Sequence, residues 1–284
     1  MLNWLARYAP LRPLLLDAEG RLQGSVLDAG CGCHGLACVS PDTPFVGLEV
    51  DFPGPTAPAM VPVRVRPGRL PFADGAFDTV ISLDVLEHVP PAERRLFVAE
   101  LTRVTARRAI VACPSDEAAH IDRTLAELYA RCGLPIPGWL SEHDEHGLPS
   151  AAEIAHCVTG HDGFVARPLP TTNGLLATMA VVADMFPHFM AEAARSVHAH
   201  GGDWAGVFEA ASFGDSFRKA WVLERVEPLA PLVDRDRVEE TMEPALRYPS
   251  CGGELAPACA GCGALVRRLP NGVWDVVPGL GLAA

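Results

Sequence analysis

The stretch VLDAGCGCHG, residues 26–35, runs from an apolar strand into a glycine-rich turn. Gly30, Gly32 and Gly35 follow the pattern G-x-G-x-x-G, whose glycines let a backbone approach a pyrophosphate closely. Asp28 stands two residues before the first of these glycines. Its carboxylate would face the same crevice as the phosphates and repel them, whereas a ligand carrying an ammonium or sulfonium group would be attracted. The stretch therefore predicts a strand–turn–helix unit that binds a ligand, and it favours a cationic one.

An acidic residue at the end of the next strand indicates a ligand with a ribose. Glu49 lies at the position where a ribose-binding acid is expected in such folds. Its carboxylate can accept two hydrogen bonds from a ribose diol. A dinucleotide such as NAD fits the glycines and Glu49 but not Asp28. S-adenosylmethionine (SAM) fits all three features, and a tight turn with no ligand is the remaining alternative.

Around this turn, short apolar runs rich in β-branched residues alternate with stretches of helical periodicity, which is typical of a parallel sheet with crossover helices. The strands are expected at residues 25–29, 45–50, 61–66, 77–83, 108–113, 163–169 and 217–226. Helices are expected at about 2–18, 35–40, 91–106 and 117–132.

Two further stretches exceed what a minimal alternating sheet needs. They span residues 114–160 and 172–214, and the second is rich in Met, Phe and His. Insertions after the carboxyl ends of strands lie over the crevice where ligands bind in open α/β sheets. We therefore expect both to form a lid on the substrate side.

The composition limits the class of partner. The 284 residues carry a formal net charge of −12, with 49% hydrophobic and 20% charged residues, so a soluble globular enzyme fits better than a nucleic-acid-binding protein. No apolar run approaches the roughly 18 to 20 residues that span a bilayer. The N-terminal residues lack the pattern of an export signal, and nine cysteines is an odd number. These features predict a cytoplasmic protein with free thiols.

A second motif points to a family. LPFADGAFDTVISLDVLEHVP, residues 70–90, resembles the segment leading into the fourth strand of class I SAM-dependent methyltransferases, in particular the type 11 methyltransferase domain. VLDAGCG, VGLEVD and LTRVTARRAIVACP extend the resemblance over residues 25–114, and SFRKAWVLERV at 216–226 resembles the last, antiparallel strand of that family. The resemblance implies an α/β fold with a Rossmann-like seven-stranded mixed sheet and an inserted helical lid.

The resemblance also implies which residues bind SAM. Asp28 and the backbone of Ala29, Gly30, Cys31 and Gly32 would hold the methionine end. The remaining contacts would be made by Glu49 to the ribose, Val50 to the adenine, and Ser82 and Leu83 beside the sulfonium. Two departures from the family pattern stand out: the third glycine is displaced by one position, and Arg66 stands where relatives place an acid that meets the adenine amine.

Two histidines are candidates for catalysis. His88 follows Glu87 just past the fourth strand, near the point of transfer, and His143 lies in the stretch SEHDEHG, residues 141–147. A base is needed only if the acceptor carries a proton of high pKa, such as that of a hydroxyl. His88 can equally cap or orient a helix. The stretch 141–147 can be a solvated polar loop or a metal pair, since histidines and carboxylates suit transition metals.

The C-terminal residues are rich in cysteine, glycine and proline. YPSCGGELAPACAGCGALVRRLPNGVWDVVPG, residues 248–279, resembles a zinc ribbon and, more distantly, the small ribbon proteins that activate methyltransferases. Cys251, Cys259 and Cys262 occupy three ligand positions, but Tyr248 stands at the fourth. Either a three-cysteine zinc site completed from elsewhere or a metal-free ribbon fits this pattern.

The sequence thus predicts three parts: a methyltransferase domain at 1–228, a linker helix at 229–245, and a degenerate, β-rich ribbon-like module at 246–284. The predicted activity is methyl transfer from SAM to a small-molecule, sugar or natural-product acceptor. An RNA or protein methyltransferase and a catalytically inactive binding module are the alternatives. We expect no nucleic-acid partner, and the sequence does not indicate an oligomeric state.

Overall fold

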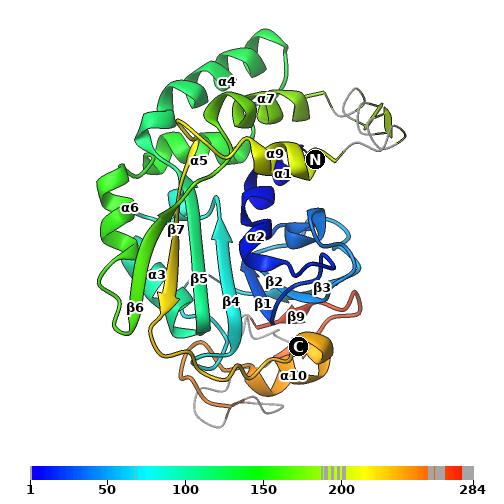
Figure 1. Cartoon of the computed structure of the whole chain (residues 1–284), viewed down its shortest axis with the longest axis vertical. Coiled ribbons are helices and arrows are strands. Elements are labelled where there is room, and N and C mark those ends of the chain that lie inside the picture. The colour runs from blue at the N-terminus through cyan, green and yellow to red at the C-terminus, as the bar shows by residue number, and fades with distance from the viewer. Residues whose placement is uncertain are drawn as a thin grey trace, which may run out of the picture.

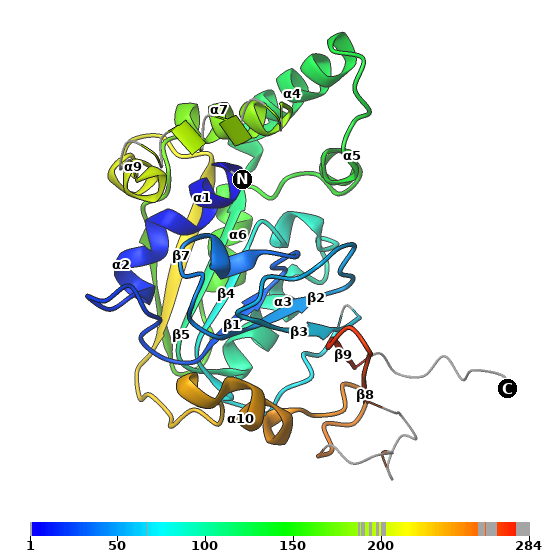
Figure 2. The same ribbon diagram turned by 90° about the vertical axis from the view of Figure 1, so that its right-hand side faces the viewer.

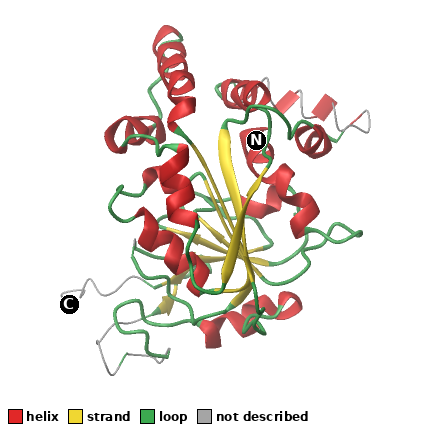
Figure 3. Ribbon diagram, turned by 60° about the vertical axis from the view of Figure 1, so that its left-hand side comes forward, coloured by secondary structure: helices red, strands yellow, loops and turns green. Residues whose placement is uncertain are grey.

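A computed structural model describes residues 2–66, 68–186, 188, 191–192, 195–196, 199, 203–254, 259 and 266–276 of the chain. One sheet runs through the molecule, with helices on both faces (Figures 1 and 3). The strands of the sheet lie in the order β6-β7-β5-β4-β1-β2-β3-β9-β8. Their bounds are β1 Val26–Ala29, β2 Phe45–Glu49, β3 Met60–Arg64, β4 Phe77–Leu83, β5 Thr105–Pro114, β6 Phe164–Leu169, β7 Arg218–Arg225, β8 Arg267–Arg268 and β9 Trp274–Asp275.

The strands β1 to β5 are parallel to one another, and β7 runs antiparallel between β5 and β6. The glycine-rich turn leaves β1 in the middle of the sheet, where the strand order reverses between β4 and β2. Ligands of open α/β sheets bind at such a reversal, outside the carboxyl ends of the strands. The predicted class, a mixed Rossmann-like α/β sheet, is confirmed.

The helices follow the predicted ranges closely near the N-terminus and divide the two insertions into short segments. The α-helices are α1 Leu2–Tyr8, α2 Arg12–Leu15, α3 Arg94–Arg103, α4 Ala119–Arg131, α5 Gly138–His146, α6 Ala151–Val158, α7 Gly174–Asp184, α9 Trp204–Ala210 and α10 Val238–Ala245. Short 3-10 helices are η1 Ala9–Leu11, η2 Gly35–Cys38, η3 Leu86–His88, η4 Asp116–Ala118 and η5 Arg235–Arg237.

Alternation along the central strands creates two buried layers. Val80 of β4 packs with Val98 of α3 in the layer on one face, and Ile81 packs with Leu11 and Leu36 in the layer on the other. All five side chains are at most 1% exposed. Because successive side chains of a strand point to opposite faces, a continuous apolar run such as TVISL can serve both layers at once.

The C-terminal residues extend the main sheet instead of standing apart from it. β9 pairs in parallel with β3, and β8 pairs with β9. Asp275 of β9 forms an ion pair with Arg64 of β3, at 3.0 Å. The sheet therefore has nine strands where seven were predicted, because the edge of β3 is paired by the tail. Without this pairing β3 would present unpaired N–H and C=O groups to solvent.

The residues between the last long strand and the tail pack against the domain. Val233 and Val238 are buried in the layer that contains β4 and α3. The N–H of Val233 donates to the carbonyl of Ala76, at 2.9 Å. Of the range 229–245 predicted as a linker helix, only residues 235–245 are helical.

Several helices of the two insertions gather with α1 above the carboxyl ends of the parallel strands, as Figure 2 shows for α4, α5, α7 and α9. α10 lies at the opposite end of the sheet. α1 contacts α7 and α9, so the N-terminal segment is part of the same cover. Within the described residues no helix is both long and apolar enough to cross a membrane.

Candidate functional site

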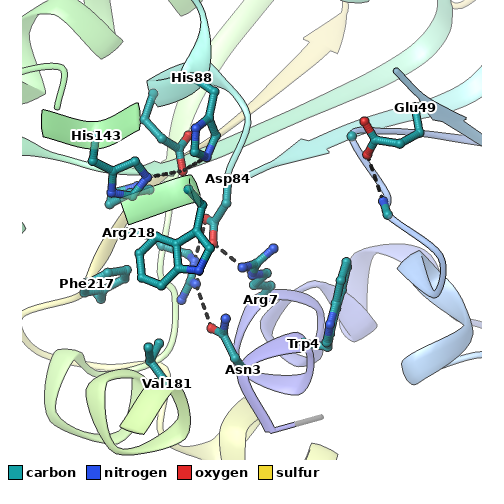
Figure 4. A pocket seen from close by; sticks show the side chains of 15 residues that line it. Asn3, Trp4, Arg7, Glu49, Asp84, His88, His143, Val181, Phe217 and Arg218 are labelled. Carbon is teal, nitrogen blue, oxygen red and sulfur yellow. Dashed lines mark hydrogen bonds and ion pairs between the residues drawn. The ribbon is translucent and has the colours of Figure 1, made fainter. Parts of the chain in front are cut away.

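A cavity of about 250 Å³ lies at the carboxyl ends of the parallel strands, beneath α1, α5 and α7. Figure 4 shows its wall, with Glu49 at one end and the two histidines at the other. We call these the donor end and the acceptor end. The residues that line the cavity are Asn3, Trp4, Arg7, Gly30, Gly32, Glu49, Asp84, Glu87, His88, Pro114, Trp139, His143, Val181, Phe217 and Arg218.

The glycine turn forms the floor of the donor end. Gly30 has φ +83°, and a Cβ atom there would lie 2.1 Å from Cγ2 of Val85. Only glycine fits this position, since both the backbone angle and the space exclude a side chain. Gly32 has φ +55° and lies beneath the ring of Trp4, which a Cβ atom would meet at 2.9 Å. The turn thus presents bare backbone to the cavity.

Glu49 is held at the donor end by two backbone groups. Its Oε2 accepts a hydrogen bond from the N–H of Gly32, at 3.0 Å, and its Oε1 accepts one from the N–H of Val50, at 2.8 Å. Burial raises the pKa of Glu49, while these two hydrogen bonds act in the opposite direction. Each carboxylate oxygen keeps further lone pairs, so the fixed carboxylate can accept hydrogen bonds from a ligand.

Asp28 lies behind the cavity and not on its wall. Its side chain is fully buried. The carboxylate accepts hydrogen bonds from the hydroxyl of Tyr8, at 3.0 Å, and from the N–H of Leu36, at 2.9 Å. Gly35 leaves room for this arrangement, since a Cβ atom there would lie 2.5 Å from Oδ2 of Asp28. Asp28 therefore ties α1 and the end of the glycine turn together, where the sequence had predicted a direct ligand contact.

Burial raises the pKa of the Asp28 carboxyl to about 7, against the lowering effect of its hydrogen bonds from Tyr8 and Leu36. The group therefore binds a proton more tightly in the folded protein than in the unfolded chain.

The other predicted SAM contacts divide into wall residues and buried residues. Gly30, Gly32 and Glu49 line the cavity. Ala29, Cys31, Ser82 and Leu83 are all buried, at 0 to 2% exposure, and none of them is among the residues that line the cavity. Val50 is 55% exposed and lies beyond the residues that line the cavity.

A buried charge cluster forms the middle of the acceptor end. Arg218, at the start of β7, donates to both oxygens of Asp84 through Nε and Nη2, each at 2.6 Å. Arg7 of α1 adds an ion pair to the same carboxylate, at 2.9 Å. The two guanidinium groups outweigh burial and lower the pKa of Asp84 to about 2. Asp84 has φ +54°, a left-handed conformation that turns the chain sharply after β4.

The two predicted catalytic histidines meet at the far side of this cluster, although 55 positions separate them in the chain. Their ring centroids are 4.9 Å apart. Nδ1 of His143 lies 2.9 Å from Oδ2 of Asp122, and Nδ1 of His88 lies 2.7 Å from Oε2 of Glu142. Nε2 of each ring lies 3.9 Å from Oε1 of Glu87. The sequence prediction thus selected two residues that the fold brings together.

The carboxyl of Glu87 is fully buried between these rings. Burial and the nearby Asp84 raise the pKa of Glu87. Burial and the neighbouring His143 lower the pKa of His88, so its neutral form is favoured. A neutral imidazole offers a lone pair on one ring nitrogen, which can accept a proton or bind a cation.

Several wall residues had no distinguishing signal in the sequence. Trp4 and Arg7 come from the first helix, and Arg218 comes from the last long strand. Asp84 and Glu87 carried a usable signal, because they stand directly after a buried strand whose carboxyl end faces the cavity.

The two described cysteines of the tail, Cys251 and Cys259, are not among the residues that line this cavity. Sγ of Cys251 and Sγ of Cys259 are 3.4 Å apart. Tyr248, at the position of the missing fourth ligand, is fully buried against Cys259 and Val266. Cys262 lies outside the described residues, so the three-cysteine zinc site stays a prediction.

One segment of the chain is similar to a known protein family. Residues 27–113 match a family described as a methyltransferase domain. This segment runs from β1 through β5 and contains Glu49, Asp84, Glu87 and His88. The predicted enzyme class, a SAM-dependent methyltransferase with SAM as the methyl donor, is confirmed.

The chain matches none of the curated proteins, but solved structures resemble it. Magnesium protoporphyrin IX methyltransferase from Synechocystis PCC 6803 is 17% identical over 70% of this chain and 73% of that one, with a TM-score of 0.36. A SAM-dependent methyltransferase from Mesorhizobium loti is 13% identical over 79% of this chain and 100% of that one, with a TM-score of 0.43. The plantazolicin methyltransferase BpumL is 9% identical over 79% of this chain and 83% of that one, with a TM-score of 0.42.

Proposed function

We propose that the methyltransferase acts on a small-molecule, sugar or natural-product acceptor, which enters the acceptor end of the cavity. The observation that carries this proposal is the position of His88 and His143 in the same cavity wall as Gly30, Gly32 and Glu49. A methyl donor bound over the glycine turn and an acceptor bound beside the histidines would share one enclosed space.

The donor is proposed to lie with its ribose on Glu49, its adenine toward Val50, and its methionine end on the backbone of the glycine turn from Ala29 to Gly32. Ser82 and Leu83 would border the sulfonium through their backbone. Asp28 would act indirectly, by fixing the turn through Leu36.

The size and charge of the cavity support a small acceptor. Its volume of about 250 Å³ is of the size that suits a small molecule. Acids at both ends, among them Glu49 and Glu87, and a net charge of −12 oppose a polyanion such as RNA. The described cysteines are present as thiols, which supports the proposal that the enzyme acts in the cytoplasm.

Methyl transfer from a sulfonium is an in-line displacement. The nucleophile of the acceptor forms a bond to the methyl carbon as the carbon–sulfur bond breaks, and alignment supplies much of the acceleration. We propose His88 and His143 as the catalytic residues that act on the nucleophilic atom. An imidazole can do so by taking the proton of that atom or by holding a cation that acidifies it.

Two measurements test this function. Calorimetric titration with S-adenosylhomocysteine, with NAD in a parallel cell, establishes the donor site if only the former binds. Isotope-labelled SAM is then incubated with the enzyme and a cell extract. Label in the small-molecule fraction supports the proposal, and label confined to precipitated RNA or protein contradicts it.

The roles of the histidines are tested with a matched pair of variants on one helix. We expect His143→Gln to lower the rate of methyl transfer by at least about 100-fold, because a positioned group that moves a proton contributes that much or more. The affinity for S-adenosylhomocysteine should stay unchanged. His146→Gln, at the end of α5 and outside the cavity wall, is the control. Equal rates in the two variants would remove His143 from the mechanism.

A further inference from the structure

Three metal-binding side chains converge at the acceptor end. One nitrogen or oxygen atom from each of Glu87, His88 and His143 lies within 4.8 Å of the other two. Nε2 of each histidine is 3.9 Å from the same oxygen of Glu87. Bonds of about 2.1 Å to a tetrahedral ion place ligand atoms about 3.4 Å apart. The two separations from Glu87 exceed this value by about 0.5 Å, and the limit of 4.8 Å exceeds it by about 1.4 Å, so side-chain shifts of up to about that size would bring all three atoms onto one ion.

The surroundings of the Glu87 carboxylate indicate that it binds a ligand. It is fully buried, and neither oxygen has a hydrogen-bond partner among the described residues. The nearby guanidinium groups of Arg7 and Arg218 are engaged with Asp84. Burying a carboxylate without donors costs several kcal/mol. A cation bound to Glu87 would remove this cost. If one histidine acted only as a catalytic base, the Glu87 carboxylate would still lack a partner and the cost would remain.

A carboxylate lies beside Nδ1 of each histidine. Asp122 of α4 is hydrogen-bonded to Nδ1 of His143, at 2.9 Å, and the half-exposed Glu142 lies 2.7 Å from Nδ1 of His88 as an ion pair. Metal-bound histidines typically donate their other ring N–H to a carboxylate, which fixes the tautomer and leaves the opposite nitrogen free for the ion. A lone base needs one such pair. Here a carboxylate stands beside Nδ1 of both rings, and Nε2 of each ring lies 3.9 Å from the same oxygen of Glu87.

We propose that Glu87, His88 and His143 bind a divalent transition-metal ion, such as Mn²⁺, Fe²⁺, Co²⁺ or Zn²⁺. Two imidazoles and one carboxylate are a ligand set that these ions accept, with coordination positions left open. The open positions would face the cavity, which all three residues line.

The use of this ion rests on the proposed function. An acceptor hydroxyl or phenol binds the ion through oxygen and releases its proton to water, since a bound divalent ion strongly lowers the pKa of such a group. The resulting oxyanion attacks the methyl carbon of SAM, so that a C–O bond forms as the C–S bond breaks. The products are the methyl ether and S-adenosylhomocysteine, and no oxidant or reductant is required.

The test measures metal binding without donor or acceptor. The full-length protein is freed of metal with a chelator and titrated with Mn²⁺, and the unbound ion is followed by electron paramagnetic resonance. Mn²⁺ prefers nitrogen and oxygen over thiolate ligands, which limits a contribution from the cysteine-rich tail. We expect one bound ion in the wild type and a loss of affinity of at least 10-fold in Glu87→Gln and His143→Gln. Asp122→Asn, which alters only the orienting carboxylate, should lose about 10- to 100-fold.

Matched controls decide between outcomes. His146→Gln and Cys251→Ser should bind Mn²⁺ like the wild type. Glu87→Gln should abolish the rise in melting temperature that Mn²⁺ gives the wild type, because it removes the carboxylate ligand. The effect of Mn²⁺ on the melting temperature can be measured even if a variant has no methyltransferase activity.

Absence of binding up to millimolar Mn²⁺, or binding that survives in Glu87→Gln and is lost in Cys251→Ser, would overturn the metal site. Equal rates of methyl transfer with chelator and with Mn²⁺ would overturn its role in the reaction. The binding of S-adenosylhomocysteine is scored separately, so failure of the metal proposal is distinguishable from failure of the proposed function.

Discussion

The donor end and the acceptor end of the cavity are built in opposite ways. Apart from Trp4 of α1, which lies over Gly32, the donor end comes from one continuous segment, residues 30–49, and presents backbone together with one carboxylate. The acceptor end is assembled from side chains of α1, η3, α5, α7 and β7 together with Asp84, which follows β4, and it contains several buried charges. Methyltransferases share the donor SAM, and a tight turn of bare backbone can supply the one geometry that this donor needs. Their acceptors differ, and a wall of separate side chains can be adapted to each acceptor by single substitutions.

The largest effect is expected where the acceptor end depends on a buried charge pair. Arg218→Met should destabilise the fold by about 3 to 5 kcal/mol, because it leaves the Asp84 carboxylate buried with one partner fewer. The measurement is urea unfolding at neutral pH. Lys219→Met is the matched control on the same strand, since its ion pair with Glu117 is exposed; we expect less than about 1 kcal/mol there. Similar losses in both variants would mean that the buried cluster adds no special stability.

The second effect concerns Asp28, which supports the donor end from behind. Its pKa of about 7 in the folded protein exceeds its unfolded value, so its contribution to stability is full below the unfolded pKa and declines as pH rises toward 7. From about pH 5.5 to about pH 8 the wild type should lose about 2 kcal/mol relative to Asp28→Asn, which stays neutral. Unfolding of both proteins across this range provides the measurement, with the exposed Asp42→Asn as control. Parallel pH profiles would show that Asp28 is ionised throughout.

The smallest effect concerns a residue of the donor wall itself. Glu49→Ala should weaken binding of S-adenosylhomocysteine by about 1.5 kcal/mol, or roughly tenfold, as expected for lost hydrogen bonds to a charged group. Calorimetry measures it, and Asp51→Ala, two residues further on and exposed, is the control. An unchanged affinity of Glu49→Ala for S-adenosylhomocysteine would show that Glu49 does not bind the donor. The contrast drawn between the two ends of the cavity would then be wrong.

The same contrast explains what the sequence could predict. The donor end follows local rules: glycines where the turn needs positive φ, and an acid at the end of the next strand. Its residues are therefore recognisable within a short stretch. Even there, the direction of the Asp28 side chain was missed, because it depends on Tyr8, which reaches it from helix α1 at the start of the chain. Strand positions were predicted well, since long apolar runs mark a buried parallel sheet.

The acceptor end depends on contacts between residues far apart in the chain. Arg7 and Arg218 reach one carboxylate from opposite ends of the sequence, and nothing local distinguishes either from other arginines. His143 was singled out by its setting among acids, but its partner Asp122 was not. The strands β8 and β9 were also missed as part of the sheet, because two-residue strands carry no periodicity and form only by pairing with an existing edge.

The pairing of β9 with β3 has a consequence for folding during synthesis. Asp275 is made 211 residues after its partner Arg64. At typical rates of about 5 to 20 residues per second, this interval amounts to about 10 to 40 s. Throughout that time β3 is the outermost strand on its side of the sheet, and the nascent domain exposes an edge that other chains can pair with. The last strands of the tail thus act as a late closing step, after which this edge is no longer available to other chains.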